Sequence, residues 1–330
     1  MQFSTHLLKL ARRPCNYRGS LVLASRSLSA SSAFSNAQSQ GTKVIQPTLG
    51  VAAAMKAQSD SRFQPKVQIF QEFALKDGVA VVTGGNGGLG LEMAMALAEA
   101  GATLYCIDLP DTPSPEFNAC AAYAEKLGTS FNYVKADVTS QAQMSSVISK
   151  IAQQHGRIDA CVAAAGILGP TETSALDLSE DDFRKVQNVN TTGVFLTAQA
   201  ALNGMVKTGS KGSIILIASM SGSIVNRGHP WVAYNTSKSA VLQMARNLAC
   251  EFGKDGIRVN TISPGHIYTK QTAAVLDLHP EQGKIWANSN PLGRMGQVHE
   301  LRGVVTWLAS SASSFCTGSD ILVSGGHHAW

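Results

Sequence analysis

The sequence predicts a single α/β domain over residues 75–330, in which a doubly wound parallel sheet is flanked by helices. Short apolar runs alternate with longer amphipathic stretches along this part of the chain, and a glycine-rich turn follows the first apolar run. Strands that alternate with helices form a parallel sheet that helices cover on both faces. The sequence shows no internal repeat, so one domain accounts for this length of chain.

The expected strands are short, apolar and separated by helical patterns. The first runs over Val79–Val82, and the helix that follows it runs over Leu89–Ala100 and ends at Gly101. Five further strands are expected at Ala102–Ile107, Tyr133–Lys135, Ala160–Ala164, Ser213–Ile217 and Arg258–Ile262. Apolar runs of this length, bounded by turn residues, are typical of strands that are buried on both faces.

Composition and charge exclude several classes of protein. Hydrophobic residues make up 44% of the 330 residues and charged residues 15%, which is ordinary for a globular protein. No apolar stretch is long enough to predict a membrane span. Seven of the 27 basic residues and none of the 22 acidic residues precede Asp60. The residues from Asp60 on therefore carry a net charge of −2 and predict no nucleic-acid surface.

Metal binding is not expected either. The six cysteines are scattered, without the spacing of a metal site or of a disulfide framework. Cys106 and Cys161 lie in apolar runs, which predicts small buried side chains. His327 and His328 are adjacent in the sequence, so their side chains point in different directions and a metal site is disfavoured.

Residues 1–40 have the composition of a mitochondrial transit peptide. They are rich in serine, contain arginine and lack acidic residues, and they have no apolar run long enough for a secretory signal. We therefore expect import into the mitochondrial matrix, and the alternative is a disordered tail on a cytoplasmic protein. Residues 41–74, which include Pro47 and Pro65, are expected to form a linker.

The turn after the first strand carries the pattern of a dinucleotide-binding loop. Thr83 and Gly84 are followed by Gly88, Leu89 and Gly90, and a predicted strand and helix enclose the turn. Glycines leave the backbone open to a pyrophosphate, and the following helix directs N–H groups and a positive dipole end toward it. A plain glycine-rich turn is the alternative, but the strand–turn–helix context favours a Rossmann domain that binds NAD or NADP.

Asp108 ends the second predicted strand, 18 residues after Gly90. A carboxylate at this position can accept hydrogen bonds from both ribose hydroxyls and repels a 2′-phosphate. No lysine or arginine lies between Gly90 and Lys126, so NAD is preferred and NADP is the alternative. Asp137 and Val138 follow the third predicted strand and are candidates for the adenine edge, with a helix N-cap as the alternative role of Asp137.

Four further residues are candidates for catalysis. Tyr234 and Lys238 lie four residues apart, which places both on one face of a helix. Ser219 lies 15 residues upstream of Tyr234 at the end of an apolar strand. Asn190 lies in a helical stretch, where a buried structural amide is an equally good interpretation.

These residue types suit proton and hydride transfer. A free tyrosine titrates near pH 10, but a neighbouring ammonium and a cationic nicotinamide favour the phenolate. We expect Tyr234 to exchange a proton with an alcohol or a ketone while hydride moves to or from the cofactor. Ser219 is expected to orient the substrate oxygen and to stabilise its developing charge.

Together the motifs resemble the short-chain dehydrogenase/reductase family over residues 75–330. The resemblance rests on the glycine-rich loop, on Asn190 in Val-Asn-Thr-Thr-Gly, on Ser219 in Ser-Met-Ser-Gly, on Tyr234 with Lys238, and on Pro-Gly-His-Ile-Tyr-Thr at 264–269. It implies that Asn190 holds water in a proton relay and that Lys238 also contacts the nicotinamide ribose.

The same resemblance implies further contacts and an assembly. Four residues of this loop are expected to contact the cofactor: Pro264, Gly265, Ile267 and Thr269. Thr269 is expected to contact its carboxamide. Residues 268–295, an irregular stretch with a partly apolar composition, correspond to the family's substrate lid. The helices that contain Asn190 and Tyr234 are expected to pair in a homotetramer or homodimer. Candidate contacts, some of which must belong to the monomer core, are Val194, Phe195, Val241, Leu242 and Leu248.

The chain departs from the family pattern at three places. Ala163-Ala164-Ala165-Gly166 stands where the family has Asn-Asn-Ala-Gly, which removes polar contacts on the adenine side. Ser324-Gly325-Gly326 replaces a usual Asp-Gly-Gly near the end of the chain. The gap between Ser219 and Tyr234 is slightly longer than in many members, which makes Ser221 a rival for the serine role.

The expected activity is the NAD(P)-dependent interconversion of a secondary alcohol and a ketone. The segment Phe70–Leu75 and the Ser219 motif resemble fungal members that act on polyols and ketoses, which favours such a substrate. A 3-hydroxyacyl or other lipid-type alcohol is the alternative. A catalytically silent dinucleotide-binding scaffold is disfavoured because Tyr234 and Lys238 are both present. A nucleotide-sugar epimerase or dehydratase is disfavoured because no second substrate domain is expected.

Overall fold

The computed structural model describes residues 48–330, and the expected transit peptide over 1–40 lies outside them. The chain divides into two units, Met1–Pro65 and Lys66–Trp330. The described part of the first unit contains α1 (Gly50–Ser59), an alanine-rich helix that buries none of its residues. The second unit begins with the short helix α2 (Ile69–Glu72). The described part of the expected linker is therefore helical over two segments.

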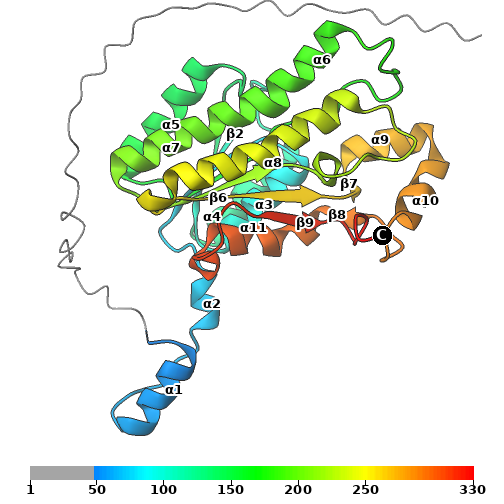
Figure 1. Cartoon of the computed structure of the whole chain (residues 1–330). Coiled ribbons are helices and arrows are strands. Elements are labelled where there is room, and N and C mark those ends of the chain that lie inside the picture. Colours follow the sequence, from blue (N-terminus) through cyan, green and yellow to red (C-terminus); the bar gives the residue numbers. More distant parts are fainter. Residues whose placement is uncertain (1–47) are drawn as a thin grey trace, which may run out of the picture. The chain divides into compact units, whose positions relative to one another are not determined.

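The second unit is built on a seven-stranded sheet in which every pairing is parallel (Figure 1). Its strand order is β3-β2-β1-β4-β5-β6-β9. The strands are β1 (Val79–Thr83), β2 (Thr103–Asp108), β3 (Phe131–Lys135), β4 (Ala160–Ala163), β5 (Ser213–Ile217), β6 (Arg258–Pro264) and β9 (Asp320–Val323). The order reverses direction between β1 and β4, where open parallel sheets form their ligand crevices. The predicted doubly wound α/β fold is confirmed.

Helices cover both faces of the sheet, as Figure 1 shows for α5, α7 and α8 on one side and α3 and α11 on the other. The first face is covered by α5 (Gln141–His155), α7 (Val194–Thr208) and α8 (Val232–Phe252). The second face is covered by α3 (Gly88–Glu99), α4 (Pro115–Lys126) and α11 (Arg302–Ala309). The shorter helix α6 (Glu180–Gln187) leads into a π-helical turn, η1 (Asn188–Gly193).

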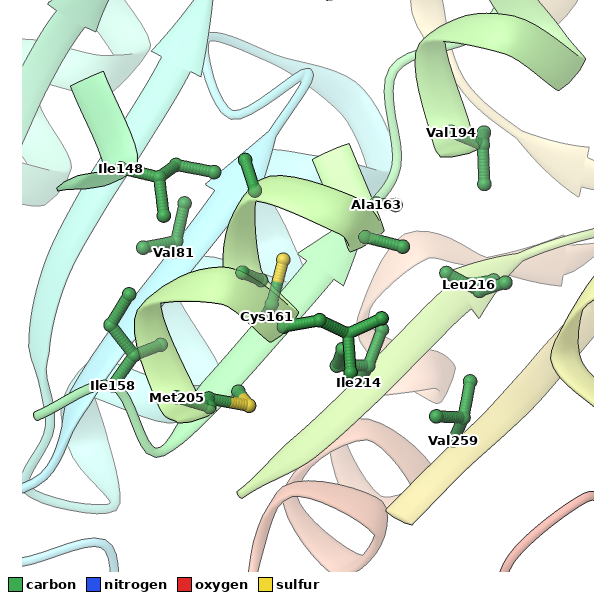
Figure 2. Close-up of a cluster of buried hydrophobic side chains, with 14 of the residues drawn as sticks. Val81, Ile148, Ile158, Cys161, Ala163, Val194, Met205, Ile214, Leu216 and Val259 are labelled. Carbon is green, nitrogen blue, oxygen red and sulfur yellow. The ribbon is translucent and has the colours of Figure 1, made fainter. Parts of the chain in front are cut away.

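The strands are buried because alternate side chains enter two separate cores. On β1, Val79 and Val81 pack toward α5 and α7, whereas Ala80 and Val82 pack toward α3. Figure 2 shows the first of these cores, in which Val81 and Cys161 lie among aliphatic side chains. Burying one aliphatic side chain of this size contributes roughly 1.5–3 kcal/mol, so both cores stabilise the sheet. Cys106 and Cys161 are buried, as predicted.

All six expected strands are present, but the seventh strand, β9, was not predicted.

The lid region also differs from its prediction. Residues 268–295 were expected to be irregular, but they contain α9 (Lys270–Leu278) and α10 (Pro280–Asn288). Pro280 occupies the first turn of α10, where its missing N–H has no helical acceptor to lose. Within the described residues, no helix is long and apolar enough to cross a membrane.

The remaining short elements connect these layers. Two two-residue strands, β7 (Ile267–Tyr268) and β8 (Gly296–Gln297), pair with each other at the two ends of the lid region. Short 3₁₀ turns are η2 (Met220–Gly222), η3 (Gly253–Asp255), η4 (Val298–Leu301) and η5 (Ser311–Ser313).

Candidate active site

A cavity of about 1000 Å³ lies where the strands of the main sheet end. Its lining includes residues at or just beyond the carboxyl ends of six strands: Gly84, Asp108, Ala136, Ala164, Ala218 and Gly265. Ser219, Tyr234 and Lys238 line the same cavity. The predicted cofactor loop and the predicted catalytic residues therefore meet in one place, at the position where doubly wound sheets bind ligands.

The glycine-rich loop turns sharply at one end of this cavity. Gly84 and Gly88 have φ angles of +69° and +54°, which favour glycine. A Cβ on Gly90 would lie 2.2 Å from the carbonyl oxygen of Gly84, so this glycine lets α3 pack against the end of β1. A Cβ on Gly88 would meet nothing within 4 Å, which leaves the backbone open at the helix N-terminus. Leu89 also lines the cavity, whereas Thr83 is buried in β1 behind the loop.

Asp108 lies at the end of β2 beside the glycine-rich loop. Its carboxylate accepts hydrogen bonds from the backbone N–H of Asn86 at 3.0 Å and of Leu109 at 2.8 Å. The backbone therefore fixes the position of this negative charge at the cavity wall.

Asp137 and Val138 also line the cavity, but the carboxylate of Asp137 is engaged within its own loop. It accepts hydrogen bonds from both the N–H and the hydroxyl of Thr139 at 2.8 Å. The alternative role of Asp137 as a helix N-cap is wrong, because Ser140 caps α5 and accepts from the N–H of Gln143. Val138 thus offers the apolar wall at this position.

Tyr234 and Lys238 lie on one face of α8, as predicted. The Lys238 side chain is buried, and its Nζ donates a hydrogen bond to the carbonyl oxygen of Ile217 at 2.8 Å. The same Nζ lies 5.7 Å from the centre of the Tyr234 ring. The end of β5 therefore anchors the ammonium group beneath the phenol.

The structure distinguishes the two candidate serines. Side-chain hydrogen bonding with Ser219 lowers the pKa of the Tyr234 phenol, in opposition to the stronger effect of burial. Ser221 also lines the cavity, and its backbone N–H donates to the Ser219 hydroxyl at 3.2 Å. Ser221 therefore supports the loop around Ser219, and the effect on the Tyr234 pKa favours Ser219 for the serine role.

The pKa of Tyr234 was expected to be lowered, but the protein's own groups raise it above its ordinary value of 10.0. The cause is burial, which disfavours the phenolate. Burial also lowers the pKa of Lys238 to about 8, because it disfavours the ammonium. The sequence argument counted the attraction between the two groups and omitted their shared loss of hydration.

Asn190 lies in the π-helical turn η1 and its side chain is completely buried. Its amide nitrogen donates to the carbonyl oxygen of Ile167, and its amide oxygen accepts from the N–H of Ile167, both at 2.8 Å. The nitrogen also lies 3.1 Å from the hydroxyl of Ser237 on α8. The side chain is thus a structural amide that joins the loop after β4 to the helix that carries Tyr234.

The residues after β6 complete the cavity wall. Pro264, Gly265, Ile267 and Thr269 all line it. A Cβ on Gly265 would lie 2.7 Å from the Cα of Ser324, so this glycine allows the loop to pack against the end of β9. At the departure after β4, Ala163 and Ala164 stand at the two asparagine positions of the family pattern, and Ala164 lines the cavity without an amide.

A group of aromatic and histidine side chains, to which the sequence analysis gave no role of their own, also lines the cavity. His229 stacks on Trp231 with ring centres 4.2 Å apart, and His266 stacks on Trp286 with ring centres 4.6 Å apart. The indole N–H of Trp286 donates to Nε2 of His229 at 3.2 Å. We name these four residues the aromatic end of the cavity. The available signal was the short segment Gly-His-Pro-Trp before α8.

The adjacent histidines near the end of the chain have separate contacts. The ring of His327 lies edge-on to that of His266, with centres 5.5 Å apart. Nδ1 of His328 lies 2.9 Å from the hydroxyl of Ser324. No group of three or more potential metal ligands occurs among residues 48–330.

Comparison with known proteins is consistent across sequence and structure. The model of the family described as enoyl-(acyl carrier protein) reductase matches residues 84–328. A short chain dehydrogenase/reductase of Aspergillus versicolor is 36% identical, with 82% of this chain and 94% of the relative covered. The sorbose reductase of Schizosaccharomyces pombe is 37% identical, with 77% and 97% covered.

Solved structures give the same result. A short-chain type dehydrogenase/reductase from Mycobacterium marinum has a TM-score of 0.73 and 38% identity, and 78% of this chain and 98% of that chain are covered. A gluconate 5-dehydrogenase from Burkholderia cenocepacia, in complex with NADP and tartrate, has a TM-score of 0.73 and 30% identity, with 79% and 99% covered.

The chain belongs to the short-chain dehydrogenase/reductase family. It is an NAD(P)-dependent oxidoreductase that acts on the CH–OH group of a secondary alcohol or on the corresponding ketone. The prediction of an enzyme over a silent scaffold is confirmed.

Proposed function

We propose that this enzyme interconverts a polyol and its ketose with NAD as the preferred cofactor. The observation that carries the proposal is the meeting of Ser219, Tyr234 and Lys238 in one cavity, between the glycine-rich loop and the aromatic end. The sorbose reductase relative supports the polyol–ketose class. A lipid-type or 3-hydroxyacyl alcohol is the alternative substrate class.

The cofactor end of the cavity fits a dinucleotide. The space above Gly87 and Gly88 is open, so the N–H groups at the start of α3 are accessible to a pyrophosphate. We expect Asp108 to accept hydrogen bonds from the adenosine ribose and Lys238 to contact the nicotinamide ribose. When bound, the nicotinamide supplies the hydride acceptor and a positive charge that favours the phenolate of Tyr234.

The chain's own residues then handle the proton. Tyr234 accepts the proton of the substrate hydroxyl during oxidation and returns it to the carbonyl oxygen during reduction. Ser219 hydrogen-bonds the substrate oxygen and holds it beside the phenol. Lys238, fixed by Ile217, keeps a positive charge beneath the phenol and stabilises its anion. Asn190 positions α8 and the loop after β4 through Ile167 and Ser237.

The preference for NAD rests on charge at the ribose end. Asp108 is fixed there by two backbone N–H groups and repels a 2′-phosphate. Two lysines of the same region are paired with carboxylates: Lys135 with Asp111, and Lys270 with Glu116. The NADP in the gluconate 5-dehydrogenase makes NADP the alternative. Measuring kcat/KM with each cofactor on one substrate tests the choice, and a value for NADP equal to that for NAD contradicts it.

The substrate class is tested by turnover of the purified enzyme. Polyols such as D-sorbitol, D-arabinitol and galactitol are compared with 3-hydroxyacyl thioesters and sterols, at one fixed NAD concentration. Turnover of at least one polyol with a higher kcat/KM than any lipid-type alcohol supports the proposal. Higher kcat/KM on the lipid-type alcohols contradicts it.

We also infer an assembly through α7 and α8 into a homotetramer or homodimer. Four of the five apolar residues considered from the sequence are buried in the subunit's own core: Val194, Val241, Leu242 and Leu248. Phe195 is 39% exposed and remains a candidate for an intersubunit contact. A stable monomer in light scattering at micromolar concentration refutes the assembly.

Import into the mitochondrial matrix remains our proposal for the location. Its support is the acid-free, arginine- and serine-containing composition of residues 1–40. A fluorescent reporter fused behind residues 1–60 should co-localise with a matrix marker. A diffuse cytosolic signal contradicts the proposal and favours the cytoplasmic alternative.

A further inference from the structure

The aromatic end lies beside Tyr234, so we expect the substrate's remaining carbon atoms to contact it. The ring of Trp231 lies edge-on to that of Tyr234, with centres 6.3 Å apart. His229 stacks on Trp231 and joins Trp286 through a hydrogen bond. A continuous line of contacts therefore runs from the phenol of Tyr234 to α10, and the glycine-rich loop lines the same cavity.

Cations are absent from the aromatic end of the described structure. Among residues 48–330, the lysines and arginines that line the cavity are Lys238 and Lys270. The first donates to Ile217 beneath the phenol, and the second is paired with Glu116 on α4. Glu172 is an acidic residue that lines the same cavity. Its carboxylate lies 3.1 Å from Nε2 of His279, so that histidine provides no unpaired positive charge.

The two histidines of the aromatic end are held neutral by their surroundings. An indole N–H only donates, so Nε2 of His229 must accept from Trp286 and carries no proton. Gln282 lies 3.1 Å from the same nitrogen. Burial also lowers the pKa of His229, and it lowers that of His266 to about 3. Neither ring offers a charge to an anionic substrate.

Asn226 adds an uncharged hydrogen-bonding group to the cavity. It lines the cavity, and His229 donates its backbone N–H to the Asn226 carbonyl at 3.1 Å. Its side chain is buried, and neither the amide nitrogen nor the amide oxygen has a partner in the described part of the chain. An amide offers one donor group and one acceptor, which suits a hydroxyl, whereas a carboxylate only accepts.

We propose that the aromatic end makes this enzyme select uncharged polyols and ketoses and reject the sugar acids of the same chain length. The inference rests on the proposed polyol–ketose function and adds a rule for specificity to it. A carboxylate placed among Trp231, Trp286 and neutral histidines would lose its hydration without gaining a cation, whereas a terminal hydroxyl would not carry that cost. The solved relative named for gluconate shows that the same fold can serve an acid substrate.

The test uses substrate pairs that differ only at one terminal carbon: D-sorbitol with D-gluconate, D-arabinitol with D-arabinonate, and galactitol with galactonate. For whichever polyol is turned over, we expect kcat/KM of the acid to be at least about tenfold lower, since rejecting one unpaired buried charge is worth at least that factor. An acid that matches its polyol overturns the inference and leaves the proposed function standing. Absence of turnover on every polyol, with a lipid-type alcohol accepted, overturns both.

A charge-restoring variant separates electrostatic rejection from poor fit. Gln282 lines the cavity and contacts His229 from α10, so Gln282→Arg brings a cation to the aromatic end. Gln282→Met removes the same contact without adding charge and is the matched control. We expect the ratio of acid to polyol kcat/KM to rise at least about tenfold in the arginine variant relative to the methionine variant, because one ion pair at moderate dielectric contributes more than that factor. Equal ratios in the two variants contradict the proposal.

Discussion

Tyr234→Phe is the sharpest test of the proposed chemistry, because it removes one hydroxyl and leaves the ring in place. The ring packs edge-on to Trp231 and above the ammonium of Lys238, and phenylalanine retains both contacts. Hydrogen bonding with Ser219 has only a minor effect on the pKa of the phenol, so loss of the hydroxyl should change the free energy of unfolding by about 1 kcal/mol or less. Fold and cofactor binding should therefore survive the substitution.

The expected effect on catalysis is much larger. A general base typically contributes 10²–10⁴-fold, which corresponds to about 3–5 kcal/mol of barrier height. Burial raises the pKa of the phenol in the protein alone, so alcohol oxidation in the wild type should rise with pH as the phenol loses its proton. Ketone reduction needs the protonated phenol and should fall over the same pH range. Both profiles report an apparent pKa shared by Tyr234 and Lys238.

The assay measures kcat in both directions from pH 6 to pH 10, with circular dichroism and cofactor titration as controls for fold and binding. In Tyr234→Phe we expect kcat to fall at least a hundredfold and its pH dependence to flatten. If a folded, cofactor-binding Tyr234→Phe variant kept more than a tenth of the wild-type kcat on a good substrate, Tyr234 would not be the base.

Three further predictions follow from the same cavity. Asp108→Ala should raise KM for NAD and narrow the ratio of kcat/KM between NAD and NADP, and an unchanged ratio would remove Asp108 from cofactor choice. Lys238→Met should abolish turnover and weaken cofactor binding, yet raise the melting temperature at pH 7, since burying the ammonium costs about 3 kcal/mol below pH 8. The pKa of Lys238 is about 8 in the folded protein and 10.5 ordinarily, so the free energy of unfolding of the wild type should rise between these pH values. The melting-temperature advantage of Lys238→Met should shrink over the same range. Ser219→Ala should lose most activity while Ser221→Ala keeps it, and the opposite result would move the serine role to Ser221.

The sequence predicts the fold well where burial is strong on both faces. The runs at Val79–Val82 and Ser213–Ile217 become completely buried strands. β9 escaped prediction because it is four residues long, lies at the edge of the sheet and is only half-buried, so its apolar run is weak. The lid helix α10 escaped for a related reason, because Pro280 and Gly283 mask its helical period.

The sequence predicted those parts of the site whose residues lie close together in the chain. Tyr234 and Lys238 share a helix face, and the glycine-rich loop lies between a strand and a helix, so both motifs were visible. The aromatic end joins residues near 230, 266 and 286, and only the tertiary fold brings them together. The raised pKa of Tyr234 in the protein alone was missed for the same reason, since burial cannot be read from a motif.

Unpartnered polar groups and a suppressed charge concentrate around this cavity. The buried side-chain atoms without a partner in the described residues belong to Asn226, Asn235 and His327. Asn226 lines the cavity, Asn235 follows Tyr234 on α8, and the ring of His327 contacts His266. A buried polar group without a partner costs about 1–3 kcal/mol, and the fold itself gains nothing from placing three of them here. Asn226 and the buried ammonium of Lys238 line the cavity itself, so a bound substrate and cofactor could offset the stability lost at these two groups.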